Sequence, residues 1–590
     1  LVFDECHLLS PVSNLRRALD GMFCVLAFNS IAPEADFLFL SAMLDNGAAF
    51  AEWIEELTGR TCVFADPLWK PSRQARGVLL YESAAIVQMT RNAIAVQRAE
   101  DARKKKRAKN LRKPAAEALQ CPPHALFGLR HNWLAGAAPS CTLTAISDAP
   151  VTLTGKLNRD GSIYLTPNVN KVAAQVAAAA ARNGLKGIVF VNRKDTAAST
   201  AREISALLGD PPEQTQDEEE RWKALEIELG GLEHAILPGP AAAVPHNALM
   251  LRLERDLAER LFRRADGAKV IVATPTLAQG LNLPAHIAIL AGDKRSDPDE
   301  GGREDLEAHE ILNAAARAGR AGHLANGIVL LIPEGVLQFR QGRPFTKEVL
   351  NKLKSVLPED DRCLSLSDPL QTILDRINVA AAADPDVEYA LNRLATAVAP
   401  EGAETEATTR FSIGRSLAAF NAIRINQKAE FDAKVARLNE LIGERAKEAD
   451  DQVLAELATQ SGAPLGILKS LRQRIEDQIE RLPQTIPDWT SWIINWLAED
   501  QDARDAILIR DGRTILGATG NKKDGPLTAD AVRNLEPGIL AWLRGESLHE
   551  IERQLGGDPA EKANCPRARE LVSQLVPLSL SFAAGLAART

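Results

Sequence analysis

Two adjacent carboxylates follow the first apolar run of the chain. Leu1-Val2-Phe3 has the composition of a buried strand, and Asp4 and Glu5 come directly after it. At the carboxyl edge of a parallel sheet, one carboxylate can bind Mg²⁺ and a second can polarise a water molecule for attack on a phosphate. The same pattern also occurs as an exposed acidic strand end, so its interpretation depends on partners elsewhere in the chain.

A pair of arginines is the natural counterpart of these acids. Arg317 and Arg320 lie three residues apart in a segment of Ala and Gly that begins at Asn313. This spacing places both guanidinium groups on one helical face. Planar guanidinium forks suit phosphate oxygens and the charge that develops during phosphoryl transfer. A solvated helix face is the usual alternative, but no acidic residue lies close in sequence to recruit the two arginines.

Two further strand ends carry groups suited to phosphate chemistry. The apolar run Val270–Ala273 ends in Thr274, and a turn containing Gly280 follows, where a backbone can approach a ligand closely. Ser41 directly follows the apolar segment 37–40, and its hydroxyl can form a hydrogen bond with the acidic cluster. We interpret these positions as parts of one site.

The elements that position these residues form an α/β pattern followed by a helical one. Short apolar runs alternate with helical spacing over residues 1–80, and a complete second αβ series covers 166–335, with strands expected at 187–191, 269–273, 287–290 and 327–332. Residues 81–165 form a less regular insertion with a basic helical stretch at about 84–119, and 336–590 are mainly helical. A small hairpin is expected at 506–516.

Composition narrows the class of protein. The chain has 590 residues, 45% of them hydrophobic and 25% charged, as in globular proteins of several domains. Its seven cysteines contain no Cys-x-x-Cys pair, which argues against zinc sites and disulfides and favours a reducing, cytoplasmic environment. No apolar run reaches the roughly 18–20 residues of a membrane span. Since the net charge is −8, nucleic acid would have to bind at local basic surfaces.

In their order and spacing, these segments resemble motifs II to VI of superfamily 2 DExH-box helicases. The matching segments are Asp4-Glu5-Cys6-His7, Ser41-Ala42-Met43, 188–193, 274–285 and 313–320. The form of segment 273–285 is similar to the Ski-like branch. The resemblance covers residues 4–322 and implies part of a first RecA-like lobe, a complete second RecA-like lobe and a helical C-terminal region.

The resemblance implies ATP and Mg²⁺ as ligands. In this family Asp4 would hold Mg²⁺ and Glu5 would act as the base for the hydrolytic water, while Arg317 and Arg320 would reach the γ-phosphate from the other lobe. The nucleotide would also be bound by Gly280, Asn282 and Asn313.

It also implies residues that link the nucleotide to a nucleic-acid strand. His7 and Ser41 would couple the nucleotide state to strand movement. The backbone of the strand would be contacted by Asn192, Arg193, Thr274 and Thr276.

The chain departs from the family pattern in several places. Met43 replaces a Thr, Asn313 replaces a Gln and Ala316 replaces a Gly. No Gly-x-x-x-x-Gly-Lys-Ser/Thr segment occurs, so the phosphate-binding loop is missing. Because the chain opens with Leu1 inside a strand, we expect this loop upstream of a truncated N-terminus, and we expect the chain alone to be inactive.

Three further segments concern nucleic acid. Residues 103–113 hold eight basic residues in eleven, which fits either a phosphate-backbone contact or a solvated insertion. Segment 451–480 fits a winged-helix or helix-turn-helix element, or a plain helical hairpin. Segment 538–552 resembles the C-terminal helical module of Ski-like helicases.

The expected function is therefore an ATP-dependent helicase or translocase, moving 3′ to 5′ by family resemblance, on single-stranded or partly duplex DNA or RNA. The sequence does not distinguish DNA from RNA. A companion nuclease fits this class of protein. The alternative is a non-catalytic nucleic-acid-binding or partner-docking scaffold, for which Met43 is the best support and intact Glu5 and Arg320 are evidence against.

Overall fold

Nine strands in the middle of the chain build one large, mostly parallel sheet. Along the sheet their order is β11, β12, β10, β13, β16, β3, β5 and β6, and β17 extends the edge of β3. The strands from β11 to β3 are parallel, whereas β5 and β6 are antiparallel to their neighbours. In chain order they are β3 (Arg73–Glu82), β5 (Pro123–Leu129), β6 (Ser140–Ala145), β10 (Gly187–Val191), β11 (Ala243–His246), β12 (Val270–Ala273), β13 (Ile287–Ala291), β16 (Asn326–Ile332) and β17 (Gln338–Phe339).

The structure is a computed structural model. It describes residues 1–11, 14–41, 43–65, 73–129, 140–274, 283, 285–296, 303–319, 326–358, 362–380, 384–394, 413–448, 452–508, 528–560 and 563–590.

Helices cover both faces of this sheet. Ile188 and Phe190 of β10 belong to one hydrophobic core, and the alternate residues Val189 and Val191 belong to another, as the two-residue period of a strand requires. On the first face lie α8 (Arg252–Arg263), α9 (Ala308–Ala315) and α10 (Lys347–Val356); on the second lie α5 (Val169–Arg182) and α6 (Lys194–Leu208). The predicted doubly wound arrangement is therefore confirmed for this part of the chain.

β3 links the start of the chain to this sheet. It pairs with β16 in parallel, with Arg73 opposite Asn326, and with β5 in antiparallel. Residues up to 80 were expected to lie with the N-terminal unit, but β3 lies in the larger sheet because its apolar residues Val78–Tyr81 are buried there.

The N-terminal residues form a second, smaller layer. The strands β1 (Val2–Phe3) and β2 (Leu38–Phe39) pair in parallel, as predicted from the apolar runs, and α1 (Leu15–Ile31) and α2 (Gly47–Thr58) pack against them. The other side of this layer is covered by α11 (Pro369–Ala380), α12 (Pro385–Leu394), α13 (Leu417–Arg424) and α14 (Lys428–Glu448). Trp53 donates to the carbonyl of Arg415 at 2.9 Å. The part that follows the large sheet thus returns to the N-terminal part.

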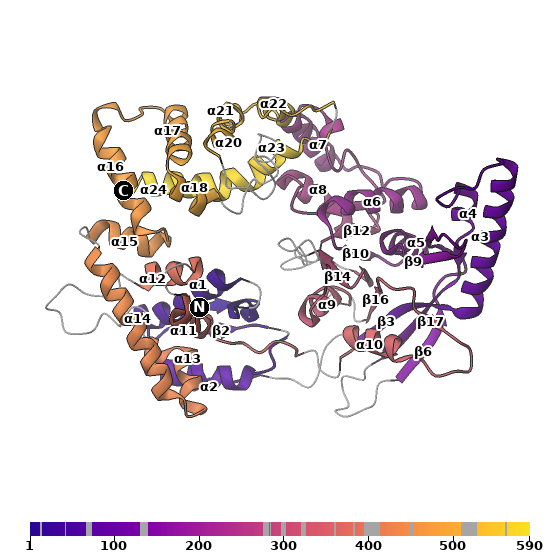
Figure 1. The fold of residues 1–590 in the computed structure, drawn as a ribbon, viewed down its shortest axis with the longest axis horizontal. Coiled ribbons are helices and arrows are strands. Elements are labelled where there is room, and N and C mark those ends of the chain that lie inside the picture. Colours follow the sequence, from indigo (N-terminus) through magenta and orange to yellow (C-terminus); the bar gives the residue numbers. More distant parts are fainter. Residues whose placement is uncertain are drawn as a thin grey trace.

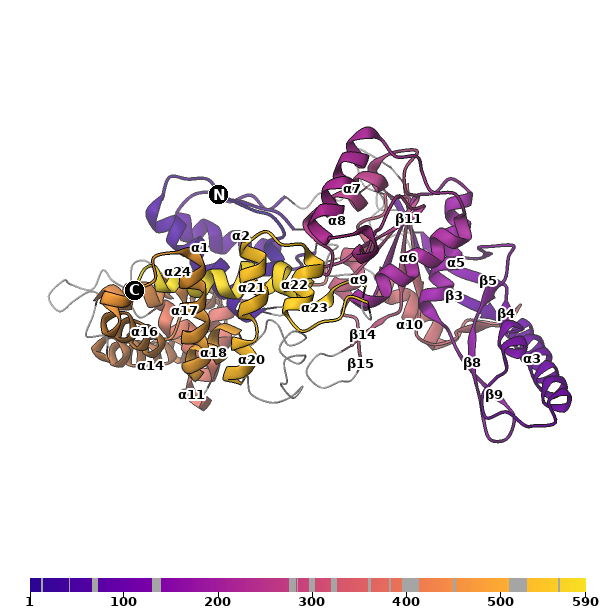
Figure 2. The same cartoon turned by 90° about the horizontal axis from the view of Figure 1, so that it is seen from above.

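The helices from residue 452 onward form an arch between the two layers (Figure 1). It begins beside α14 and ends against α7 (Gln216–Leu229) and α8. Its members are α15 (Gln452–Ser461), α16 (Leu465–Asp477), α17 (Ile486–Glu499), α18 (Gln501–Leu508), α20 (Ala529–Arg533), α21 (Glu536–Leu543), α22 (Leu548–Gln554), α23 (Pro566–Glu570), the π-helical segment Leu571–Leu580 and α24 (Ser581–Ala587). Seen from above, the arch lies over the N-terminal side and the large sheet lies at the opposite end (Figure 2).

Two predictions in the C-terminal part have different outcomes. The expected helix pair at 451–480 is confirmed as α15 and α16, which meet at a turn with Gly462. The hairpin expected at 506–516 is wrong for its first strand, because α18 continues to Leu508; residues 509–516 lie outside the described residues.

A buried ion pair attaches the arch to the large sheet. Both guanidinium arms of Arg569 contact the carboxylate of Glu254, at 2.5 and 3.0 Å, and the two residues are 1% and 0% exposed. Arg569 also donates to the carbonyls of Asn564, Leu249 and His234. A buried charge pair is tolerated only when its remaining donors are satisfied, and here they are.

The continuous helix Pro566–Ala587 is long and apolar enough to cross a membrane by length and composition alone. The sequence was expected to contain no such segment. In the structure its buried residues Leu571, Leu575 and Leu586 belong to the largest hydrophobic core, and Arg569 forms the ion pair described above. One third of its apolar stretch is buried within the structure.

The insertion between β3 and α5 projects from the edge of the large sheet. It contains α3 (Ser83–Arg103), α4 (Lys113–Glu117) and two short antiparallel pairs, β4 (Gln120–Cys121) with β7 (Val151–Thr152) and β8 (Thr154–Leu157) with β9 (Ile163–Thr166). The basic stretch was expected to be helical throughout, but the helix ends at Arg103, and most of the basic run forms a loop between α3 and α4.

Candidate functional site

The acid pair lies in a tight turn at the end of β1. Asp4 is exposed, and Glu5 adopts a left-handed backbone conformation with φ of 54° and ψ of 46°. A side chain other than Gly in this conformation costs on the order of 1–3 kcal/mol, and such strain is concentrated at functional sites. The turn sends the chain directly into the short helix Cys6–Leu9 and leaves the Glu5 side chain 26% exposed.

His7 connects Glu5 with the end of β2. Its Nδ1 lies 3.3 Å from the hydroxyl of Ser41 and 3.5 Å from Oε2 of Glu5. Burial lowers the pKa of His7, and the nearby charges of His309 and Arg17 lower it further. His7 is therefore neutral at pH 7, and its buried Nε2 has no hydrogen-bond partner within the described residues.

Ser41 continues this chain of contacts toward the helices that follow the large sheet. Its hydroxyl accepts a hydrogen bond from the amide of Met43 at 3.2 Å. The carbonyl of Met43 accepts hydrogen bonds from the amides of Cys363 and Leu364, each at 3.0 Å. The backbone of Met43, whose side chain is buried, thus forms a junction between the N-terminal layer and residues 363 and 364.

Arg317 approaches the acid pair from the other layer. Its Nη2 lies 3.8 Å from Oε1 of Glu5, and Arg317 is only 5% exposed. It sits in the turn after α9, the helix of the large layer that faces the N-terminal part in Figure 1. Opposite charges at this distance attract each other more strongly when solvent screening is reduced by burial.

The turn that carries Arg317 is held by its backbone neighbours. Gly319 has φ of 65°, and a Cβ at this position would lie 2.6 Å from the amide nitrogen of Gly327, so a larger residue does not fit. The amide of Gly319 donates to the carbonyl of Ala285 at 3.1 Å. Gln74 of β3 donates to the carbonyls of Ala315 and Ala318, at 3.1 and 2.6 Å. These contacts fix the position of Arg317 relative to the sheet.

Three of the residues expected to contact nucleic acid are described by the structure, and they lie at one edge of the large sheet. In the register of β10 and β12, Phe190 is opposite Ala273, so Asn192 and Thr274 follow adjacent strand ends. Thr274 is 5% exposed, Arg193 is exposed, and Asn192 donates to the carbonyl of Lys294. In open α/β sheets this carboxyl edge is where ligands bind.

The other expected site residues are placed only in part. Asn313 is buried in α9, one turn before Arg317, with 7% exposure. Thr276, Gly280, Asn282 and Arg320 lie outside the described residues.

Sequence reasoning missed several residues that shape the site. Gln74, His309 and Arg17 have no motif of their own and act through backbone contacts or through the charge they place beside His7. The sequence did offer one indication for His309: it lies in the same predicted helix as Asn313, which was assigned to the site.

The acid pair fits a magnesium site of the kind that a nucleotide completes. No group of three or more His, Cys, Asp or Glu side chains arranged to hold a metal occurs within the described parts of the chain. Mg²⁺ in phosphoryl-transfer sites needs only one or two protein carboxylates, because water and substrate phosphates supply the other ligands. The exposed Asp4, with Glu5 beside it, meets this requirement.

Comparison with known proteins identifies relatives for part of the chain. The human U5 small nuclear ribonucleoprotein 200 kDa helicase is 35% identical over 170 residues, which cover 28% of this chain and 7% of that protein. The ATP-dependent DNA helicase Hel308 of Pyrobaculum calidifontis is 32% identical over 177 residues, or 29% of this chain and 25% of that protein. The Arabidopsis DExH-box ATP-dependent RNA helicase DExH14 is 47% identical over 76 residues, covering 13% of this chain and 3% of that protein. No family model matches the chain.

The matched segments therefore span a small share of the relatives' own length. The relatives are all named as helicases, two of them with the DExH-box or ATP-dependent designation that the motifs suggest. The motifs at the two facing layers and these similarities agree: over part of its length the chain is similar to DExH-box and ATP-dependent helicases, as its resemblance to the Ski-like branch of superfamily 2 predicted.

Proposed function

We propose that this chain is part of an ATP-driven helicase or translocase in which two RecA-like lobes close on a nucleotide. The observation that supports this most is the approach of Glu5 and Arg317 to 3.8 Å. The two residues come from different layers and from opposite ends of the motif series. An acid that activates water and an arginine that stabilises transferred charge have to meet in this way across a shared phosphate.

Bound ATP and Mg²⁺ would supply the phosphoryl group and the charge that neutralises its oxygens. Asp4 would hold the metal, and Glu5 would accept the proton of the attacking water. Arg317 and Arg320 would contact the γ-phosphate. In the structure the guanidinium of Arg317 faces the carboxylate of Glu5. We infer that nucleotide binding replaces this ion pair by contacts between Arg317 and phosphate.

Three more residues are proposed to contact the nucleotide. Asn313 lies one helical turn from Arg317, which supports its role, and Gly280 and Asn282 are assigned by family resemblance.

His7 and Ser41 are proposed to transmit the state of Glu5. Their contacts run from Oε2 of Glu5 through His7 and Ser41 to the backbone at Met43. Displacement of Glu5 would alter each of them.

The strand of nucleic acid is proposed to lie along the carboxyl edge of the large sheet, against Asn192, Arg193, Thr274 and Thr276. The arch of C-terminal helices would form the far wall of its path (Figure 1). DNA and RNA both fit, since contacts to a backbone carry little base information.

All seven cysteines are free, which supports the proposal of a reducing, cytoplasmic location. A companion nuclease remains part of the proposal by family resemblance only.

Turnover requires a phosphate-binding loop, and this sequence contains no Gly-x-x-x-x-Gly-Lys-Ser/Thr. We therefore expect the chain alone not to hydrolyse ATP. Reading the gene upstream of the codon for Leu1 is the first test. A Gly-Lys-Ser/Thr loop there supports the motor, whereas a loop without its Lys supports the alternative, a non-catalytic scaffold.

The decisive assay is ATP hydrolysis by a protein that contains both the loop and this chain, with and without single-stranded DNA or RNA. The proposal expects ATPase activity that either polynucleotide stimulates. Activity that neither stimulates, or none with an intact loop, contradicts it.

A further inference from the structure

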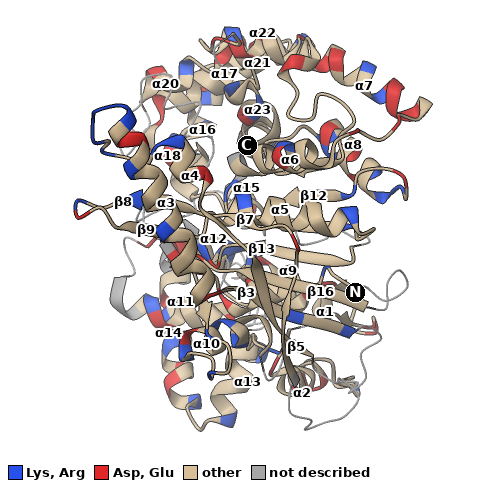
Figure 3. Ribbon diagram, turned by 90° about the vertical axis from the view of Figure 1, so that its right-hand side faces the viewer, with Lys and Arg blue, Asp and Glu red and all other residues tan. Residues whose placement is uncertain are grey.

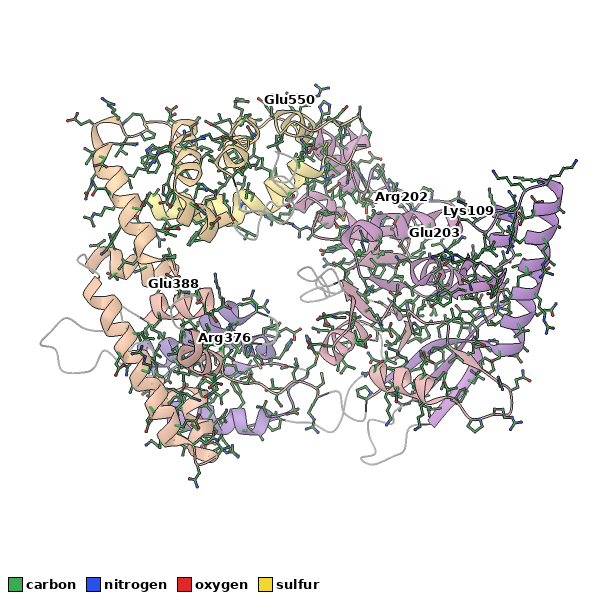
Figure 4. The ribbon with its side chains drawn as sticks, viewed as in Figure 1. Lys109, Arg202, Glu203, Arg376, Glu388 and Glu550 are labelled. Carbon is green, nitrogen blue, oxygen red and sulfur yellow. The ribbon has the colours of Figure 1, made fainter. Side chains whose placement is uncertain are left out.

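The insertion at the edge of the large sheet carries a concentrated positive surface outside the proposed strand path. We define the basic loop as Lys104–Lys109, which contains Lys104, Lys105, Lys106, Arg107 and Lys109. All five basic side chains are exposed. Figure 3 shows the loop in blue at the end of α3, and Figure 4 labels Lys109 at the outer side of the large layer.

The charges in this loop are not neutralised by neighbouring acids. At the margins of the basic run, Arg103 pairs with Glu100 at 2.9 Å, Arg112 with Asp101 at 2.7 Å and Lys113 with Glu117 at 3.9 Å. The five basic residues of the loop form no ion pair within the described residues. A solvated helical face usually alternates its charges, so this arrangement differs from that of an ordinary surface.

The loop is nevertheless built on an ordered base. The carboxylate of Asp101 accepts hydrogen bonds from Arg112, from the amide of Ala108 at 3.2 Å and from Gln97 at 3.3 Å. The side chain of Arg112 also donates to the carbonyl of Lys106 at 2.6 Å. These bonds fix both ends of the loop and direct its lysines away from the fold.

A second anchor connects the loop to the β8–β9 hairpin. Arg107 donates to the carbonyl of Arg159 in the hairpin turn at 3.0 Å. Beneath it, Leu111 and Leu119 pack against the hairpin at Gly155, where a Cβ would lie 2.9 Å from Leu119. The exposed Arg159 adds a further positive charge beside the loop, and Asp160 in the same turn is engaged by Ser162 at 2.7 Å.

We propose that the basic loop binds the phosphate backbone of nucleic acid outside the path between the lobes, as a sequence-independent tether. The inference rests on the proposed function for the presence of nucleic acid. Repulsion among five like charges is relieved by a polyanion whose charges repeat at short intervals, and binding then releases counterions. Lysine side chains of a fixed loop suit phosphates as point charges and do not read bases.

The test measures binding of the full chain to a fluorescently labelled 25-base-pair DNA duplex and to a labelled oligo(dT) strand across a series of salt concentrations, without ATP. The variant replaces Lys104, Lys105, Lys106 and Lys109 by Gln. The matched control replaces Arg340, Arg343, Lys347 and Lys354 by Gln, which removes the same charge from exposed positions elsewhere on this layer. Thermal unfolding of each variant verifies that it is folded.

We expect the loop variant to bind at least about tenfold more weakly at 50 mM salt, and its salt slope to fall by about 0.7–0.9 for each phosphate that the variant no longer neutralises. The control should stay within about twofold of the original chain. Equal losses in both variants would show a general charge effect and would overturn the inference. Unchanged binding by the loop variant would also overturn it, and would leave an acidic protein as the partner for the loop.

A single substitution separates loop geometry from net charge. Asp101→Asn makes the chain more positive but removes the carboxylate that fixes the loop. The inference expects weaker binding, whereas a simple charge effect predicts tighter binding. Unchanged binding by the loop variant, in a protein whose ATPase activity nucleic acid still stimulates, would count against the loop alone. Absence of any binding to nucleic acid would defeat both the tether and the proposed function.

Discussion

Two ion pairs join distant parts of this chain, and they differ in almost every physical property. Arg569 and Glu254 are fully buried, contact each other through two nitrogen–oxygen pairs and satisfy their other donors and acceptors with backbone groups. Glu5 and Arg317 approach each other to 3.8 Å, and the Glu5 side chain is partly exposed. The first pair has the features of a fixed attachment. The second has those of a contact that is made and broken.

This difference indicates which parts move together. The arch is attached to the large layer by a buried hydrogen-bond network that would be costly to open. The two layers meet at the acid pair through a longer contact whose glutamate is partly open to solvent, so phosphate or water can replace it more readily. Nucleotide-driven motion would then occur between the N-terminal layer and the large layer. The following predictions test this contrast.

The largest effect is expected from Arg317→Ala on turnover. In a protein that contains a phosphate-binding loop and hydrolyses ATP, loss of an arginine finger lowers the rate about 10³–10⁵-fold. The free energy of unfolding should fall by less than in Arg569→Ala, because Arg317 meets a partly exposed carboxylate at a longer distance. Steady-state ATPase assays and urea titrations measure the two quantities, and Arg340→Ala, at an exposed site, is the control. A normal rate would contradict the assigned role.

Arg569→Ala should have the opposite profile. It leaves the carboxylate of Glu254 buried without its charged partner, which costs about 3–5 kcal/mol. Urea titration of the chain measures this loss. Arg472→Ala, which removes an exposed helical ion pair with Glu476 at 3.1 Å, should cost less than about 0.5 kcal/mol. Similar losses in both variants would remove the contrast between a fixed and an exchangeable pair.

Glu5→Gln should change stability only slightly, by less than about 1 kcal/mol. Its side chain is partly exposed to solvent, its contact with Arg317 is long at 3.8 Å, and His7, 3.5 Å away, is neutral at pH 7 and forms no ion pair with it. Urea titration at pH 7 measures it. A loss as large as that of Arg569→Ala would show that the two pairs are equally fixed.

The smallest effect concerns pH. The folded-state pKa of His7 lies below its ordinary value of 6.5, chiefly because of burial, so the unfolded chain takes up the proton first as pH falls. Stability contributed by neutral His7 is therefore present above pH 6.5 and decreases below it, by at most about 0.7 kcal/mol between pH 7 and 6. His246, whose pKa is also lowered by burial, adds a loss of the same sign. His7→Gln should reduce the slope of unfolding free energy against pH; an unchanged slope would contradict this assignment.

The parts of the fold that follow local patterns were predictable. Apolar runs predicted strands at 187–191, 269–273 and 287–290, within one residue of the observed bounds, and periodic spacing predicted the helices between them. The position of β3 was not predictable, since its pairing with β16 depends on residues about 250 positions away. The return of α11 to α14 onto the N-terminal layer is equally non-local.

The site shows the same division. The types and order of Asp4, Glu5 and Arg317 allowed their proximity to be predicted. The sequence did not indicate that Gln74 would fix the turn after α9, because its role consists of hydrogen bonds to two backbone carbonyls. Nor did it indicate that Glu254 and Arg569 would meet, because a lone Glu and a lone Arg occur on many solvated helices.

The most direct test of the central claim is a zero-length carbodiimide cross-link between residues 5 and 317. In the Arg317→Lys variant of the chain, the new amine should couple to Glu5, and mass spectrometry should detect the linked peptides. The native pair Lys434 and Asp375, 2.9 Å apart, is the positive control, and adding Glu5→Gln should abolish only the 5–317 link. The account predicts the 5–317 link at a yield comparable to the control. Its absence while Lys434 and Asp375 are linked would contradict the claim that the acid pair and the arginine face each other.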